Sequence, residues 1–198
     1  MMTVFPAWHG MQMIGSQNLY LVGPMGSGKT AVGKQLARKL GYPFVDSDHE
    51  IELATGADIP LIFEREGEAG FRQREREMIA ALTTRERIVL ATGGGAVLDA
   101  GSRHLLRQHG WVVYLETTPG QQAERAARTR HRPLLHGVDA RQRLTELLAV
   151  RDPMYREVAD CVVTTNHRRV NAVADEILAA FQRSGGSGNA YTAGPTAS

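Results

Sequence analysis

Residues 23–30 read Gly-Pro-Met-Gly-Ser-Gly-Lys-Thr and match the pattern G-x-x-x-x-G-K-[ST] at every fixed position. The glycines permit positive φ and close approach, so that successive backbone N–H groups can surround an anion. Lys29 supplies a positive charge that reaches β- and γ-phosphates, and the Thr30 hydroxyl is placed to ligate Mg²⁺. The motif predicts that the chain binds a nucleoside triphosphate.

The segments on either side of this loop support the same interpretation. Residues 18–22 form a short apolar strand, and the apolar residues of 31–40 recur at helical spacing. A strand, a Gly-rich turn and a helix N-terminus are the setting that a phosphate-binding loop requires. The alternative, a Gly-rich turn followed by a chance Lys-Thr pair, does not explain this context.

A pair of carboxylates, Asp46 and Asp48, follows a second short strand at residues 42–45. Side chains alternate along an extended segment, so the two carboxylates are expected to point the same way. Strand carboxyl ends face the ligand crevice in parallel α/β sheets, where such a pair can serve Mg²⁺ and a substrate. The alternative is that Asp48 alone N-caps the segment 49–53.

A third strand, residues 87–91, runs into Thr92 and three consecutive glycines at 93–95. Consecutive glycines cost backbone entropy, which suggests that something must approach the chain closely there. Many phosphate-loop enzymes end this strand with an Asp that supports Mg²⁺. Because this chain has Thr92 there, Asp46 is the best candidate for that support.

Arginines occur in two helical regions near these motifs. Arg72 shares a helix face with Glu75, which by itself indicates only a solvated charged helix. Arg125 lies on a helix opened by Pro119 and leading towards Arg132 in a loop. A loop arginine can close over transferring phosphates, although plain surface charge is the commoner role.

Composition limits the class of protein. The chain has 198 residues, 42% hydrophobic and 22% charged, which are ordinary values for one globular domain. The net charge of +2 is too small to argue for nucleic acid, and no apolar run has the length of a membrane span. Cys161 is the only cysteine, so no intramolecular disulfide can form, and we expect a buried, inert thiol.

Five strands alternate with helices, which predicts a three-layer α/β fold with a mostly parallel sheet covered on both faces. The two remaining strands are expected at 111–115 and 161–164, and later helices at 99–108, 139–149 and 170–181. We expect residues 1–17 to be a flexible extension rather than a signal peptide, and residues 184–198 to be disordered. One domain then spans residues 18–183.

Taken in order, these motifs resemble those of the shikimate kinase family over about residues 18–182. The shared elements are the phosphate loop, Asp46-Ser47-Asp48, Phe71-Arg72 with Glu75, Thr92-Gly93-Gly94-Gly95, Arg132-Pro133-Leu134-Leu135, and Arg151 with Tyr155. Many families share the phosphate loop, whereas the Asp-Ser-Asp, Phe-Arg and Thr-Gly-Gly-Gly combination is far more specific.

The resemblance implies a five-stranded parallel sheet of the nucleoside monophosphate kinase type, usually in a monomer. It implies cytoplasmic, Mg²⁺-dependent transfer of phosphate from ATP to the 3-hydroxyl of shikimate, in chorismate and aromatic amino acid biosynthesis. Shikimate and ATP are then the partners, with no nucleic acid and no membrane.

The resemblance also implies roles for individual residues. Shikimate would be bound by Asp48, Arg72, Gly93, Gly94, Gly95 and Arg151. ATP would be bound by Gly26, Ser27, Gly28, Lys29, Thr30, Ala31, Arg132 and Arg168, with Arg125 a weaker candidate near the adenine. Thr30 and, through water, Asp46 would hold Mg²⁺. Lys29, Asp48 and Arg132, the last in a lid at about 126–138, would be catalytic.

Two other functions remain open on the sequence. A kinase of the same fold can act on gluconate or a nucleoside monophosphate, although Arg72 and Arg151 favour a carboxylated acceptor. A nucleotide-dependent module can bind nucleic acid through basic helices, but the chain has no aromatic stacking row or basic arm.

Overall fold

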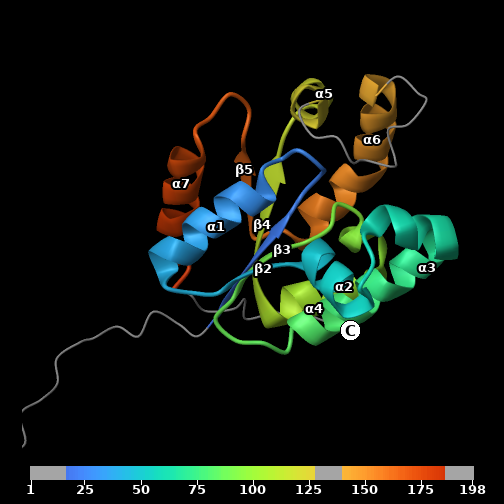
Figure 1. Cartoon of the computed structure of the whole chain (residues 1–198). Helices are drawn as coiled ribbons and strands as arrows, with labels where there is room; N and C mark the ends of the chain where they lie inside the picture. The colour runs from blue at the N-terminus through green and yellow to red at the C-terminus, as the bar shows by residue number, and fades with distance from the viewer. Residues whose placement is uncertain (1–16, 128–139, 186–198) are drawn as a thin grey trace, which may run out of the picture.

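The computed structural model describes residues 17–127 and 140–185, and its centre is a five-stranded parallel sheet (Figure 1). The strands are β1 (Asn18–Val22), β2 (Phe44–Asp46), β3 (Val89–Ala91), β4 (Gly110–Glu116) and β5 (Cys161–Thr164). Their order is β2-β3-β1-β4-β5, and every pairing is parallel. The predicted five-stranded parallel sheet is confirmed.

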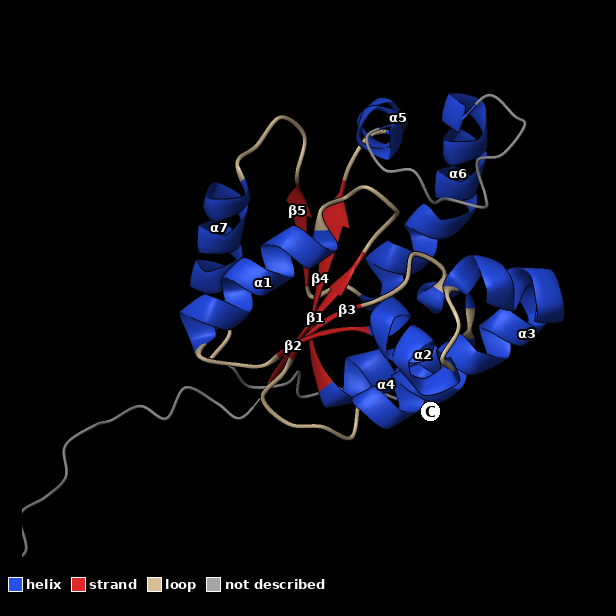
Figure 2. Ribbon diagram, in the orientation of Figure 1, coloured by secondary structure: helices blue, strands red, loops and turns tan. Residues whose placement is uncertain are grey.

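Helices cover both faces of this sheet (Figure 2). They are α1 (Lys29–Leu40), α2 (Ser47–Thr55), α3 (Ile59–Leu82), α4 (Ala100–His109), α5 (Pro119–Ala127), α6 (Ala140–Val158) and α7 (Val170–Arg183), with a 3₁₀ turn η1 at Ala96–Leu98. Helices α1 and α7 pack on one face, and α3, α4 and α6 pack on the other. None of the helices in the described part of the chain is both long and apolar enough to cross a membrane.

Alternation along β1 explains the two packed faces. Leu19 and Leu21 contribute to the core beneath α1 and α7, whereas Tyr20 and Val22 contribute to the core beneath α3, α4 and α6. All four side chains are fully buried. Successive residues of a strand point to opposite faces, so a strand buried on both sides is apolar throughout. The expected three-layer arrangement is confirmed.

The segment after β2 differs from the prediction. The chain does not remain extended through Asp48, because α2 begins at Ser47 immediately after Asp46. Asp46, rather than Asp48, is the N-cap of α2, and its Oδ1 accepts the Asp48 N–H at 3.2 Å. An Asp side chain at this position satisfies a helix N–H that lacks an intrahelical partner. Asp46 and Asp48 are therefore neighbours because one is the N-cap of α2 and the other lies in its first turn.

Helix α6 also differs from the prediction, because it continues past Ala149 to Val158 with Pro153 inside it. An internal Pro removes one helix hydrogen bond and costs ~3 kcal/mol. Tyr155 and Val158, beyond that Pro, are almost completely buried in the core and offset this cost. Arg151 and Tyr155 consequently share one face of a continuous helix.

Cys161 is partly rather than fully buried, since β5 is an edge strand of the sheet. Burial raises the pKa of its thiol above the ordinary value, so little of it is thiolate at neutral pH. This agrees with the expected lack of reactivity.

Candidate active site

The segments that follow β1, β2 and β3 meet at one edge of the sheet, where they line a cavity of about 600 Å³. Of the residues predicted for the site, the cavity is lined by Gly26, Gly28, Lys29, Thr30, Ala31, Asp46, Asp48, Arg72, Gly93, Gly94, Gly95 and Arg151. Parallel strands place their carboxyl ends at the same edge of the sheet, so motifs that are distant in sequence become neighbours.

The phosphate loop has the geometry that its motif predicts. Gly28 has φ 95° and ψ 15°, a left-handed conformation that favours glycine, and it leads directly into α1 at Lys29. The Lys29 ammonium donates to the carbonyl oxygens of Gly23 at 2.7 Å and Pro24 at 2.8 Å. Its charge is thus held over the loop, beside the N-terminus of α1.

Ser27, like Gly23 and Pro24, is a loop residue that does not line the cavity. It is fully buried, and its N–H donates to the Pro24 carbonyl at 3.3 Å. This hydrogen bond closes the turn of the loop.

Thr30 and Asp46 form a small donor set beside Lys29. The Thr30 hydroxyl donates to Asp46 Oδ2 at 2.9 Å, while the other oxygen of Asp46 caps α2. Within residues 17–127 and 140–185, no group of three or more His, Cys, Asp or Glu side chains is arranged to hold a metal. A hydroxyl backed by one carboxylate fits a cation that takes its other ligands from phosphates and water, as Mg²⁺ does.

Asp48 lies on the first turn of α2, and together with Glu75 of α3 it packs against the first residue of the glycine loop (Gly93–Gly95). A Cβ added at Gly93 would lie 2.6 Å from Asp48 Oδ1 and 2.5 Å from Glu75 Oε1. Both of these oxygens are buried and have no hydrogen-bond partner among the described residues. Two unpaired carboxylate oxygens buried beside one glycine favour a protonated form of at least one of the two groups.

The pKa of Asp48 is raised to about 7, primarily by burial and secondarily by the charges of Asp46 and Glu75. Lys29 and Arg72 oppose this shift in pKa. A carboxylate with a pKa near neutrality is suited to accept a proton at working pH.

Glu75 lines the cavity, although the sequence analysis gave it no role in the site. It is 3% exposed, and its Oε2 accepts from Arg72 at 2.6 Å. Burial raises the pKa of Glu75, and the Arg72 guanidinium opposes that increase. The pair fixes the guanidinium against the glycine loop, where a Cβ at Gly95 would lie only 2.0 Å from Arg72 Nη1. The helical charge pattern indicates the Arg72–Glu75 pair, but not its burial or its contact with the glycine loop.

Arg151 approaches the same loop from α6. It is 7% exposed, and its Nη1 lies 3.4 Å from the Gly94 carbonyl oxygen. Arg72 and Arg151 therefore flank the glycine loop and present two fixed cations to one cavity. Such a pair can bind a carboxylate in fork geometry.

Phe63 and Phe71 give the cavity an apolar wall that the sequence analysis did not assign. Their ring centroids are 4.8 Å apart. Spacing along α3 was the only available signal, and it does not distinguish a cavity wall from core packing.

Of the two arginines expected near the adenine, only Arg125 lines the cavity. It donates to the carbonyl oxygens of Gly26 at 2.7 Å and Thr165 at 3.0 Å. Arg168 is outside the cavity lining, where it pairs with Glu176 at 2.6 Å. The predicted contacts of Arg132, and those of its neighbours in the expected lid, lie outside the described residues.

One cavity is lined by a phosphate loop, a metal-compatible Thr–Asp pair, the Asp48 carboxylate and two arginines, and these features define a P-loop kinase for a small acidic acceptor. The family model described as shikimate kinase matches residues 25–182. The chain belongs to the shikimate kinase family, and it is an ATP-dependent kinase.

Individual relatives agree with this assignment. The shikimate kinase of Methylococcus capsulatus is 54% identical over 169 residues, which cover 85% of this chain and 94% of that protein. The enzyme of Pseudomonas syringae is 56% identical over 163 residues, with coverage of 82% and 95%. A solved structure of shikimate kinase from Acinetobacter baumannii, in complex with shikimate, has a TM-score of 0.83 at 51% identity, with coverage of 85% and 94%.

Proposed function

We propose that the protein transfers the γ-phosphoryl group of ATP to the 3-hydroxyl of shikimate, giving shikimate 3-phosphate and ADP. The observation that carries this proposal is one cavity lined both by the phosphate loop and by Asp48, Arg72 and Arg151. Membership of the family supports it, and so does the binding of shikimate by the similar Acinetobacter baumannii enzyme.

In the acceptor half of the cavity, Arg72 and Arg151 bind the shikimate carboxylate. The N–H groups of the glycine loop and the Asp48 carboxylate take ring hydroxyls. Asp48 accepts the proton of the 3-hydroxyl as its oxygen bonds to the γ-phosphorus and the bond from that phosphorus to ADP breaks. The oxygen that leaves stays with ADP, so the transfer needs no further co-reactant.

In the nucleotide half, the N–H groups of residues 26–31 bind the phosphates, and Lys29 neutralises charge on the β- and γ-phosphates. Thr30 would hold Mg²⁺ directly, and Asp46 would hold it through water; the bound ion supplies further charge neutralisation. Arg132 is assigned to the transferring phosphate by the family motif alone, and Arg168 to the adenine on the same basis.

The test is a coupled assay of ADP release with ATP, Mg²⁺ and one acceptor at a time. We expect turnover with shikimate and none above background with gluconate or a nucleoside monophosphate. Gluconate is the informative comparison, since it also carries a carboxylate and hydroxyls. Faster ADP release with any of the other acceptors than with shikimate would contradict the proposal.

We further propose a cytoplasmic monomer in which residues 18–183 form the catalytic domain. Use of ATP and a lone partly buried cysteine agree with a reducing compartment. Light scattering after size-exclusion chromatography measures the mass directly, and a dimeric mass would overturn the monomer.

The metal assignment predicts that Asp46→Asn impairs catalysis in a way that excess Mg²⁺ relieves. The change weakens the support of Thr30, whose hydroxyl donates to Asp46 Oδ2. A weakened metal site is refilled by mass action, so activity should approach that of the wild type as Mg²⁺ rises. A titration of turnover against Mg²⁺ measures this. Loss of activity that does not depend on Mg²⁺ would remove Asp46 from the metal site.

Gly95→Ala is expected to raise the KM for shikimate about ten- to a hundredfold, with a much smaller effect on the KM for ATP. The backbone at Gly95 has φ −101°, which alanine adopts without strain, but the new methyl group would displace the Arg72 guanidinium. A lost charge-assisted hydrogen bond corresponds to about 1.5–3 kcal/mol. Steady-state kinetics with each substrate varied in turn measures both constants.

Gly120→Ala is the matched control, because a Cβ there meets nothing within 4 Å. It should leave both constants unchanged. If Gly95→Ala behaves in the same way, Arg72 does not bind the acceptor from its observed position.

A further inference from the structure

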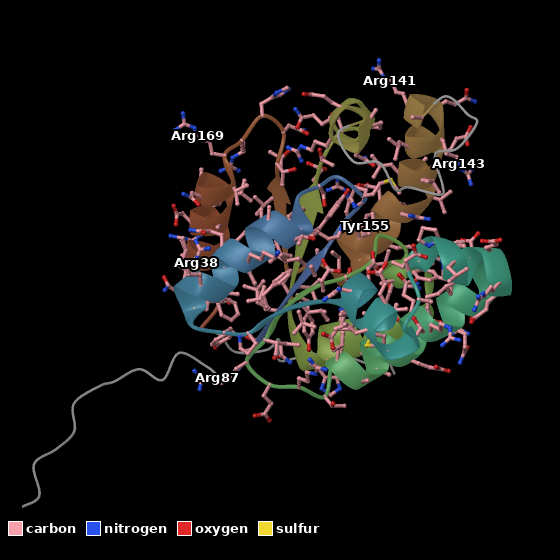
Figure 3. All side chains as sticks on the ribbon, in the orientation of Figure 1. Arg38, Arg87, Arg141, Arg143, Tyr155 and Arg169 are labelled. Carbon is pink, nitrogen blue, oxygen red and sulfur yellow. The ribbon has the colours of Figure 1, made fainter. Side chains whose placement is uncertain are left out.

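Tyr155 was recognised in the sequence only as part of a motif, and nothing above gives it a role in the reaction. Its side chain is fully buried, yet its hydroxyl reaches the active-site loop and donates to the Gly94 carbonyl oxygen at 2.5 Å. Figure 3 labels it in the interior of the molecule, whereas the labelled arginines lie at the outside. Burial raises the pKa of Tyr155, so the phenol remains a protonated donor at working pH.

The glycine loop requires such a constraint from outside. Glycine restricts its own backbone less than any other residue, so three in succession do not define one orientation of their peptide planes. Cβ atoms at Gly93 and Gly95 would collide with Asp48, Glu75 and Arg72, and side chains therefore cannot supply the rigidity. Contacts to the loop backbone must supply it.

The bond from Tyr155 acts on one particular peptide. A peptide unit is planar and trans, so the Gly94 carbonyl and the Gly95 N–H point in opposite directions. Holding the carbonyl towards Tyr155 turns the Gly95 N–H away from the buried Tyr155 ring, and Gly95 itself lines the cavity. Among the described residues no hydrogen-bond acceptor for this N–H is found. It is available to a ligand.

Tyr155 is itself held in place through the sheet. Its ring stacks on Tyr114 of β4, with centroids 4.9 Å apart and an interplanar angle of 27°. The Tyr114 hydroxyl donates to Asp152 at 2.8 Å, which ties this strand to α6 one residue after Arg151. The central sheet, the stacked rings and the Gly94 carbonyl form one continuous set of contacts.

We propose that Tyr155 is a positioning residue for the acceptor site: its hydroxyl fixes the Gly94–Gly95 peptide so that the Gly95 N–H donates to bound shikimate. This inference rests on the proposed function. The same carbonyl lies 3.4 Å from Arg151 Nη1, so the bond also sets the loop against one of the two acceptor-binding arginines.

Tyr155→Phe tests the hydroxyl alone, since the stacked ring is retained. We expect a KM for shikimate about three- to tenfold higher, the factor that one net hydrogen bond represents, with the KM for ATP changed less than twofold. Tyr20→Phe is the matched control, because Tyr20 is also fully buried but its hydroxyl contacts Asn18 and His109, outside the cavity lining. Tyr20→Phe should lower the melting temperature about as much as Tyr155→Phe does, but it should leave both KM values unchanged.

Three outcomes would overturn the inference. A Tyr155→Phe enzyme with unchanged kinetics and a lower melting temperature would make Tyr155 purely structural. Equal increases in both KM values would show a general disturbance of the site. A third measurement uses the wild type and so does not depend on how the variant folds. In an ¹⁵N-labelled sample, saturating shikimate must shift the Gly95 amide resonance and protect this amide from hydrogen exchange. An unchanged Gly95 amide would exclude the contact.

The assay also separates this inference from the proposed function. A wild-type enzyme that releases no ADP in response to shikimate would overturn the function and the inference together. Shikimate-dependent turnover that Tyr155→Phe leaves unaltered would overturn the inference alone.

Discussion

Replacement of Lys29 by methionine is expected to lower kcat by about 10²–10³, with the fold intact. Methionine keeps an unbranched apolar chain of similar length but removes the charge that lies over the phosphate loop. Positioned charges that stabilise a transition state typically contribute this factor. The Lys29 ammonium donates to the loop carbonyls of Gly23 and Pro24, so the substitution removes polar contacts of the loop rather than core packing.

The matched control is Lys34→Met on the same helix. Lys34 is exposed, with its ammonium 5.9 Å from the centre of the Phe44 ring, and it does not line the cavity. We expect wild-type kcat from this variant. If Lys29→Met retains more than about a tenth of wild-type kcat, equivalent to ~1.4 kcal/mol of barrier, the role of Lys29 is wrong.

Local patterns were sufficient to predict the sheet and the phosphate loop. A strand, a glycine turn and a helix follow one another within residues 18–40, and each is specified by its own residues. The left-handed φ of Gly28 follows directly from that pattern, whereas α1 begins at Lys29, two residues before the predicted helix at 31–40. The strand at 161–164 was predicted to the residue for the same reason.

The arrangement of the acidic groups could not be predicted in this way. Asp46 and Asp48 were expected on one extended segment, whereas a helix cap places them. Glu75 appeared to be a solvent-facing partner of Arg72, but the packing of α3 against the glycine loop buries it. Its position depends on contacts between elements distant in the chain, which helical spacing does not contain.

Helix α6 illustrates the same limit. Pro153 is normally a reason to end a helix, and residues 139–149 were expected to be its full extent. The burial of Tyr155 against Tyr114 outweighs that preference. As a result Arg151 and Tyr155 reach the glycine loop from one rigid helix.

Asp48→Asn is expected to lower kcat by about 10²–10⁴, the usual contribution of a general base. The substitution keeps the size of the side chain and removes both its charge and its basicity. Binding of ATP without shikimate should change little, because the phosphate contacts lie in residues 23–30. Excess Mg²⁺ should not restore this variant, in contrast to Asp46→Asn. Rescue of Asp48→Asn by Mg²⁺, and not of Asp46→Asn, would mean that the two roles are exchanged.

The raised pKa of Asp48 gives a second measurement on the same variant. In wild-type enzyme kcat/KM should rise with pH and level off above about 7, because the carboxylate is the active form and its pKa is about 7. The charges that face it, on Asp46, Glu75, Lys29 and Arg72, set where this midpoint falls. The residual activity of Asp48→Asn should lack this step. A variant that keeps the step would assign it to another group.

As the pH rises, the contribution of Asp48 to the stability of the ligand-free protein should fall, whereas kcat/KM should rise. The pKa of Asp48 is about 7 in the folded state and 3.8 for the unperturbed group, so between these values the folded state binds more protons than the unfolded state. The contribution of Asp48 to stability therefore falls as pH rises through that window. Asp48→Asn has no charge to bury, so at pH 8 it should melt at a higher temperature than wild type. That difference should shrink as the pH is lowered towards 4. If the wild type were instead the more stable protein at pH 8, burial would not destabilise the charged form of Asp48. Its pKa would then not be raised, which would contradict its role as a base at neutral pH.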